Sequence, residues 1–410
     1  MKKFKFIFTF VAIVSALGAL AQEEPVKEIK LKEQLNPVYT GVTSLTFSPD
    51  TRGAGLGDIG AATTPDCFSQ YWNPAKYAFT DSNTRYNIGA AGLFSLDNQD
   101  GNLNIVGYAR LGESERFTVS ASYNNYFLGK IPTEQKSDSI SPSEFYVDLA
   151  CTYRFSRSFS GAIALRYIKS GLQYYYNADE PSGSAFAADL ALYYHNVSES
   201  GRIFGLGLNL SNIGSKISYD GGATKQFIPA NLRIGASLQL PFGDRREGYE
   251  EHSLMFSIDV NKRMTPTLPT YTDYMEQEYP NYGPEDLTFY KEYQGWLHDS
   301  GYTNMSSIAG IFKSFGDAPG GFADELKEIY GGIGMEYKYM NWLSIRGGYH
   351  YENGLQWNHS YASVGAGIRL GSIKVDAAYA FGTSDDCPFN NTVRLSVTFD
   401  LANYNNPLGE

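Results

Sequence analysis

The sequence predicts an all-β fold, a 14-stranded antiparallel transmembrane β-barrel with long extracellular loops. The first observation is composition: aromatic residues make up 15% of the 410 residues, with 32 Tyr, and there are 42 Gly. The second is that segments of about ten residues alternate between apolar and polar side chains, as barrel strands do. The third is that long and short connections alternate, as expected when one rim has short periplasmic turns and the other has long loops.

The N-terminus predicts export by a cleavable signal peptide at residues 1–21. Three lysines precede an apolar run at 6–17, and small residues place the expected cleavage between Ala21 and Gln22. The run is too short for a membrane anchor, and no later apolar run reaches the 18 residues of a transmembrane helix. The mature chain is therefore expected beyond the inner membrane, in the cell outer membrane.

Fourteen segments show the alternation, an even number as bacterial single-chain barrels require. They are residues 86–96, 103–110, 117–127, 144–155, 159–169, 185–195, 201–211, 228–240, 252–262, 331–339, 342–351, 361–370, 373–381 and 392–401. Two connections depart from the pattern, because 97–102 is short for an outer loop and 241–251 is long for a turn. The remaining parts are an N-terminal segment at 22–85, a large extracellular insertion at 263–330 and a tail at 402–410.

The polar face of these segments carries charges that are expected to point into the lumen, because a lipid-facing Arg or Lys at the midplane costs roughly 2–4 kcal/mol. They are Asp148, Arg154, Arg166, Asp189, Arg233, Asp259, Glu336, Arg346, Arg369, Lys374, Asp376 and Arg394. Such charges could line a permeation path, but ion-pair networks that fill the lumen are the favoured interpretation. Tyrosines near the segment ends fit interfacial aromatic girdles: Tyr108, Tyr123, Tyr153, Tyr167, Tyr194, Tyr337, Tyr349 and Tyr379.

No catalytic or cofactor chemistry is predicted. The five histidines are scattered, and His350, Glu352 and His359 near one outer loop are more simply solvated residues than metal ligands. Cys67, Cys151 and Cys387 are widely spaced and odd in number, so they predict neither a disulfide framework nor a zinc site. A formal net charge of −11 argues against nucleic acid as a partner.

The stretch RGAGLGDIGAATTPD contains a G-x-G-x-x-G at Gly55, Gly57 and Gly60. A dinucleotide site would need a buried strand before these glycines and a helix after them. Turn-forming residues precede them, and Pro65 would stop a helix almost at once. The glycines are therefore not predicted to bind a phosphate.

The run AATTPDCFSQYWNPAKYAF, together with NPVYTGV, FIPANLRIGA, LNLSNIGSKISYD, ALRYIKS and SFGDAPGGFADELKEI, resembles the PorV (LptO) family. That family is a FadL-like component of the type IX secretion system, in which an N-terminal hatch plugs a 14-stranded barrel. The resemblance implies that residues 22–85 form a hatch whose glycines pack and turn the backbone against the wall. The hatch motif then comprises Gly53, Gly55, Gly57, Gly60, Tyr71, Trp72, Asn73 and Pro74. The acidic stretch at 264–285 matches no family feature.

The resemblance implies a protein that performs no bond chemistry. Such a protein binds the C-terminal signal domain of secreted cargo leaving the type IX translocon barrel and carries it to a sortase-like attachment complex. Its partners would be the cargo, the translocon, that complex and outer-membrane lipids, with no cofactor. Exposed aromatics of the outer loops would anchor the partner: Phe289, Tyr293, Trp296, Phe312, Phe315 and Phe322. The alternatives are a FadL-type channel for hydrophobic small molecules and a lipid-modifying enzyme.

Overall fold

The computed structural model describes residues 40–401 except for 82–83, 97–100, 113–114, 128–130, 133–138, 141, 172–181, 220–221, 223–224, 247–248, 283–288, 300, 319–320, 354–359, 384–386 and 388. The predicted signal peptide, with its cleavage pair Ala21 and Gln22, lies outside the described residues, as do the tail at 402–410 and His359.

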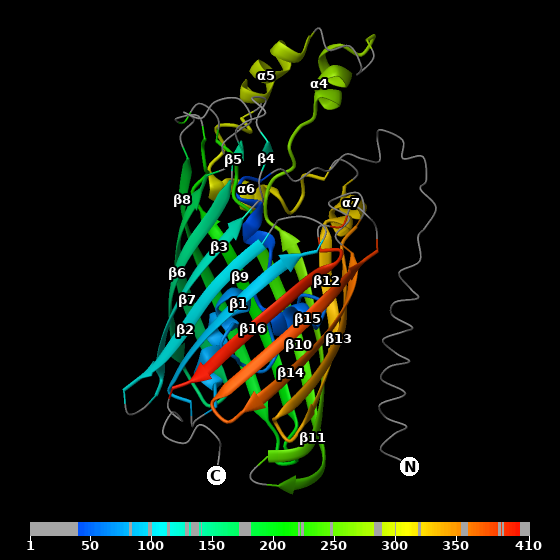
Figure 1. Ribbon diagram of the computed structural model, residues 1–410. Helices are drawn as coiled ribbons and strands as arrows, with labels where there is room; N and C mark the ends of the chain where they lie inside the picture. The colour runs from blue at the N-terminus through cyan, green and yellow to red at the C-terminus, as the bar shows by residue number, and fades with distance from the viewer. Residues whose placement is uncertain are drawn as a thin grey trace.

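Fourteen antiparallel strands close into a barrel in which β1 pairs with both β2 and β16, which confirms the predicted fold class (Figure 1). The strands are β1 Tyr86–Ser95, β2 Gly101–Leu111, β3 Phe117–Phe127, β6 Ser143–Arg154, β7 Phe159–Ser170, β8 Gly183–Val197, β9 Ile203–Gly214, β10 Asn231–Arg246, β11 Tyr249–Arg263, β12 Ile329–Tyr339, β13 Leu343–Tyr351, β14 Tyr361–Leu370, β15 Ile373–Gly382 and β16 Thr392–Asp400. Two short strands, β4 (Ile131–Pro132) and β5 (Ser139–Ile140), pair within the loop between β3 and β6.

Long and short connections sort to opposite rims of the barrel. The rim with short turns is the periplasmic one by the rule for outer-membrane barrels, and the other is called the outer rim. One predicted exception was wrong: β10 and β11 run on through 241–251, so only residues 247–248 separate them. Pro241 lies within β10 and pairs with Ser253, and a register shift follows Phe242. Bulges of this kind let a strand continue past such residues.

The strands turn apolar side chains outward and polar ones inward, as lipid outside and a filled lumen require. On β3, Val119 and Tyr123 are 39% and 37% exposed, whereas Thr118 and Ser120 are buried. Of the predicted inward charges, Arg154, Arg369 and Lys374 are half-buried and the other nine are buried. The placement of Tyr108 in a lipid-facing girdle was wrong, because it points inward and its ring centroid lies 4.8 Å from that of Tyr77.

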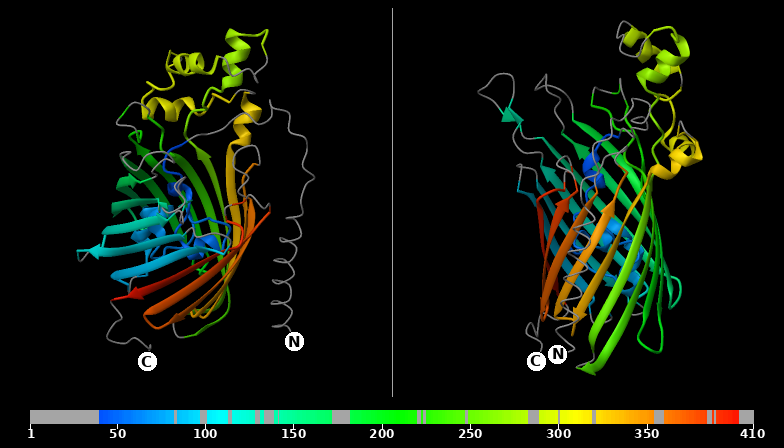
Figure 2. Two further views of the ribbon diagram at one scale, coloured as in Figure 1. Left: turned by 45° about the horizontal axis from the view of Figure 1, so that its top comes forward. Right: turned by 90° about the vertical axis from the view of Figure 1, so that its right-hand side faces the viewer.

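The helices lie inside the barrel and above its outer rim (Figures 1 and 2). Inside are η2 (Thr43–Thr46), α2 (Thr51–Ala54), α3 (Ser69–Trp72) and η3 (Pro74–Phe79), which belong to the segment at 40–85, called the hatch from here on. Above the rim are α4 (Tyr271–Glu278), α5 (Tyr290–Asp299), α6 (Ser307–Lys313) and α7 (Phe322–Lys327), all in the connection 264–328, called the outer insertion. No helix among the described residues is long and apolar enough to cross a membrane.

Candidate functional site

The hatch backbone packs directly on the backbone of the barrel wall at two of its glycines. A Cβ atom added at Gly55 would lie 3.1 Å from Cα of Gly365 on β14. One added at Gly57 would lie 2.7 Å from the backbone N and O of Tyr349 on β13. The contact at Gly57 is closer than a real Cβ atom allows, and the contact at Gly55 is tighter than most, so both glycines let main chain pack on main chain.

The other two glycines of the motif make room for an indole ring. A Cβ at Gly53 would lie 2.6 Å from Cζ2 of Trp72, and one at Gly60 would overlap the same ring. Trp72 is 2% exposed, and its Nε1 donates to Asp50 Oδ2 at 2.9 Å. Asp50 also caps α2 by accepting from the amides of Arg52 and Gly53, both at 2.9 Å. The glycine-rich turn and the tryptophan thus form one packing unit.

The N-P-A sequence joins the hatch to the strands on the other side of the lumen. The Asn73 side chain caps η3 by accepting from Ala75 N at 3.0 Å, and Pro74 occupies the first turn. Nδ2 of Asn73 donates to Ala61 O at 3.1 Å and to Leu192 O on β8 at 2.9 Å. Thr152 on β6 donates to Pro74 O at 2.8 Å. Tyr71, beside this turn, is half-buried and faces the guanidinium of Arg233.

A buried charge network ties α2 to the opposite wall. Arg52 lies 2.6 Å from Glu336 Oε2 on β12 and 2.8 Å from Asp66 Oδ2 in the hatch. Glu336 also accepts from Arg346 on β13 at 2.8 Å, and Arg346 lies 2.7 Å from Asp376 on β15. The side chains of Glu336 and Arg346 are fully buried. Each guanidinium therefore lies between two carboxylates, which offsets its desolvation.

Further anchors come from strands far apart in the sequence. Asp259 on β11 accepts from Gly60 N at 2.7 Å and from Ala61 N at 2.8 Å. Asp58 pairs with Arg394 on β16 at 2.8 Å. These contacts favour the interpretation of the inward charges as ion-pair networks over that of a permeation path.

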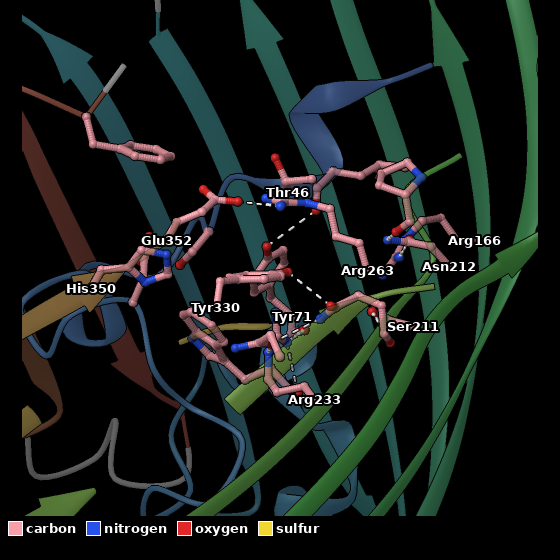
Figure 3. Close-up of a pocket in the computed structure, with 18 residues that line it drawn as sticks. Thr46, Tyr71, Arg166, Ser211, Asn212, Arg233, Arg263, Tyr330, His350 and Glu352 are labelled. Carbon is pink, nitrogen blue, oxygen red and sulfur yellow. Dashed lines mark hydrogen bonds and ion pairs between the residues drawn. The ribbon is translucent and has the colours of Figure 1, made fainter. Parts of the chain in front are cut away.

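A small polar cavity remains between the hatch and the outer rim, with a volume of about 50 Å³. Arg263 and Glu352 point toward one another across it and pair (Figure 3). The Arg263 guanidinium stacks 4.4 Å from the Tyr330 ring centroid. The expectation that His350 and Glu352 are solvated was wrong, because they are 8% and 2% exposed. Ligand pockets usually measure roughly 300–1,000 Å³, so this cavity is too small for a hydrophobic cargo molecule.

The six predicted partner-binding aromatics divide into two groups. Tyr293 is 7% exposed, and Phe289 and Trp296 are half-buried, because all three pack with Tyr274 and Met275 of α4. This cluster holds α4 and α5 together as a self-contained helical hairpin above the rim (Figure 1).

The second group, Phe312, Phe315 and Phe322, is exposed by 75%, 49% and 78%. These side chains belong to α6, α7 and the link between them. Aromatic type alone could not separate the two groups in the sequence, because the difference arises from the packing of α4 on α5.

Three carboxylates of the outer insertion lie within 4.8 Å of one another: Asp317, Glu325 and Glu328. The ammonium of Lys262 already contacts this group, 2.9 Å from Glu325 and paired with Glu328. Burial raises the pKa of both Asp317 and Glu328. Because a lysine supplies the positive charge, the cluster is a docking point for α7 and not a metal site. Sequence reasoning missed Lys262, which reads as one more polar residue at a strand end.

The decisive comparison is with protein families. The family model described as type IX secretion system protein PorV matches residues 30–270. The chain belongs to the PorV family. This confirms the resemblance predicted from the sequence, and the match covers the hatch and the strands from β1 to β11. It ends one residue before α4, so most of the outer insertion lies beyond it.

Among solved structures, the PorV-family barrel is similar to outer-membrane channels. It has 11% identity with the toluene transporter TodX of P. putida, over 86% of this chain and 97% of that one, with a TM-score of 0.48. It has 12% identity with a Pseudomonas aeruginosa FadL homologue, over 86% and 98%, with a TM-score of 0.43. A search of curated proteins finds no match.

Family and fold together identify an outer-membrane barrel with a role in type IX secretion, and they point to a non-catalytic role.

Proposed function

We propose that this PorV-family barrel is a cargo-binding shuttle of the type IX secretion system. It would bind the C-terminal signal domain of proteins leaving the translocon barrel and carry them to the sortase-like attachment complex. We also propose that residues 1–21 are its cleaved signal peptide. The observation that carries the proposal is a lumen closed by a hatch in a PorV-family barrel, together with a long helical insertion above the outer rim of this chain.

The hatch supports binding at the surface over transport through the lumen. It is hydrogen-bonded or ion-paired to β6, β8, β11, β12 and β16, and its glycines touch β13 and β14. Opening a channel would break several buried charged contacts together, each costly to leave unpaired. The side that remains free for a partner is the outer rim with its long loops.

The α4–α5 hairpin is the part of that rim proposed to contact cargo. It is held by its own aromatic cluster, so replacing residues 271–299 by a Gly/Ser linker removes no hatch contact of the residues that the structure describes. Its exposed side chains include Glu276, Glu278, Tyr282 and Glu292, which favour a partner with basic and apolar patches.

The test is affinity purification of the tagged protein from native outer membranes, with and without residues 271–299. The wild type should recover proteins that carry C-terminal signal domains together with translocon and attachment components. The hairpin deletion should recover the translocon but less cargo. Recovery of no signal-domain proteins by the wild type would overturn the proposal.

Locking the hatch to the wall with a disulfide distinguishes a shuttle from a channel. A Cβ at Gly55 would lie 3.6 Å from Cβ of Ala378, within the range of a disulfide. It would also lie 3.1 Å from Cα of Gly365, so the reduced double variant must first secrete cargo as the wild type does. The double variant Gly55→Cys/Ala378→Cys, with the three native cysteines replaced by alanine, should keep cargo secretion when oxidised. Loss of secretion on oxidation and its return on reduction would show that hatch movement is required.

A further inference from the structure

The outer aromatic girdle of the barrel has a gap. Outward-facing aromatics mark the outer ends of many strands, such as Phe127 on β3, Phe186 on β8, Tyr351 on β13 and Phe381 on β15. Beyond Phe256 at the middle of β11, the described outward positions in the outer halves of β9 to β12 hold no aromatic residue. They are mainly aliphatic, such as Ile234, with Lys262 near the end of β11. Four adjacent strands thus lack, at the outer interface, the aromatic side chains that normally mark it, whereas β2 and β16 lack them there only as single strands.

Helix α7 lies on the lipid side of the rim at this gap. Lys262 belongs to the outward-facing series of β11, in which Phe256, Ile258 and Val260 are 47%, 46% and 44% exposed. Its ammonium is held by Glu325 and Glu328 of the α7 region, so the helix covers the outside of the wall and not the lumen. In the right-hand view of Figure 2, the yellow helices stand at the edge of the barrel on the side of the green strands.

The faces of α6 and α7 that point away from the barrel are apolar. Ile308 and Phe312 are spaced i, i+4 on α6 and are 62% and 75% exposed. Phe322 and Leu326 have the same spacing on α7 and are 78% and 50% exposed.

The opposite faces dock on the barrel. Gly310 of α6 is buried against Phe227, and the Phe315 ring lies 5.7 Å from Lys262 Nζ. The outer insertion therefore folds without burying these apolar side chains.

We infer that α6 and α7 form a lip that rests in the outer-leaflet lipid interface and completes the girdle over β9 to β12. The apolar side chains of both helices continue the lipid-facing surface of β11 directly above its outer end, where Lys262 contacts Glu325 and Glu328. Lys313 is exposed beside them, and an anionic outer leaflet would attract it. The partner of these aromatics is lipid, and the cargo surface lies elsewhere on the outer rim.

The test places a nitroxide label on single cysteines in the full-length barrel, after replacement of the native cysteines by alanine. The probe sites are Phe312→Cys and Phe322→Cys. Val260→Cys on the lipid-facing wall is the lipid reference, and Tyr282→Cys, 54% exposed beyond the end of α4, is the water reference. Each variant is first shown to give the compact folded band on an unheated SDS gel.

In vesicles of phosphatidylethanolamine and phosphatidylglycerol, labels at 312 and 322 should collide with oxygen in preference to a water-soluble nickel chelate, as the label at 260 does. Nickel accessibility equal to that at 282 would overturn the inference. Labels that are water-accessible in vesicles but shielded in native outer membranes would overturn it in favour of a protein partner. Because the vesicles hold no secretion component, the result is independent of the proposed shuttle function.

Discussion

Replacing Gly57 by alanine tests whether the hatch presses on the wall, and Gly112 offers a matched control. Both glycines have left-handed backbones, with φ of +80° and +73°. A Cβ at Gly57 would lie 2.7 Å from backbone atoms of Tyr349, whereas one at Gly112 would have nothing within 4 Å. Both variants therefore share the conformational penalty, and only Gly57→Ala adds a clash.

The magnitudes follow from these geometries. The left-handed conformation costs an alanine about 1–2 kcal/mol. Carbon atoms pack best at about 3.5–4.0 Å, so a contact at 2.7 Å forces the hatch and β13 apart. Overpacking of this kind costs about 1–3 kcal/mol. Gly57→Ala should thus destabilise the barrel by about 2–5 kcal/mol and Gly112→Ala by about 1–2 kcal/mol.

The assay heats the protein in SDS and measures, on a gel, the temperature at which the compact folded band converts to the unfolded band. Guanidinium unfolding followed by tryptophan fluorescence supports it. The difference of about 1–3 kcal/mol corresponds to roughly 5- to 150-fold in the unfolding constant. Equal destabilisation by the two variants would refute the close packing of hatch on wall. Nucleotide affinity is expected in neither the wild type nor the variants.

Three further predictions concern the wall and the lip. Gly348→Ala, which places a Cβ against the Leu56 backbone from the wall side, should destabilise the same unfolding transition as Gly57→Ala by about 1–3 kcal/mol, and a double variant should cost less than the sum. Glu336→Gln should lower stability by about 3–5 kcal/mol because it leaves two buried guanidiniums short of charge, whereas the exposed Glu278→Gln should change the same melting temperature little. Lys262→Met should free α7 at a cost of about 1.5–3 kcal/mol and speed protease cleavage in the outer insertion. As a control, Lys327→Met removes a lysine that is 48% exposed and paired with Asp324, and it should not speed cleavage. Equally fast cleavage of the two variants would contradict the docking role of Lys262.

The strands could be predicted because lipid outside and polar contacts inside impose a period of two on every residue. On β3 that period separates Val119 from Thr118 without any knowledge of the partner strand. The continuation of β10 past Pro241 could not be predicted, because it depends on pairing with β11 and on a register shift after Phe242, and not on local propensity. The hatch contacts were hidden for another reason: the glycine spacing is visible, but Tyr349 and Gly365 meet it only through tertiary packing.

The partners of the hatch have a consequence for assembly. Asp58 is paired with Arg394, 336 positions later, and Thr84 donates to Asp400, 316 positions later. The hatch can therefore reach its final position only after the last strand has arrived. Contacts of such high contact order make folding slow, because the loop-closure entropy is paid before the contacts form. Closure of the barrel and docking of the hatch should therefore occur together, late in folding. A chain that lacks β16 should fail both to close the barrel and to hold the hatch in place.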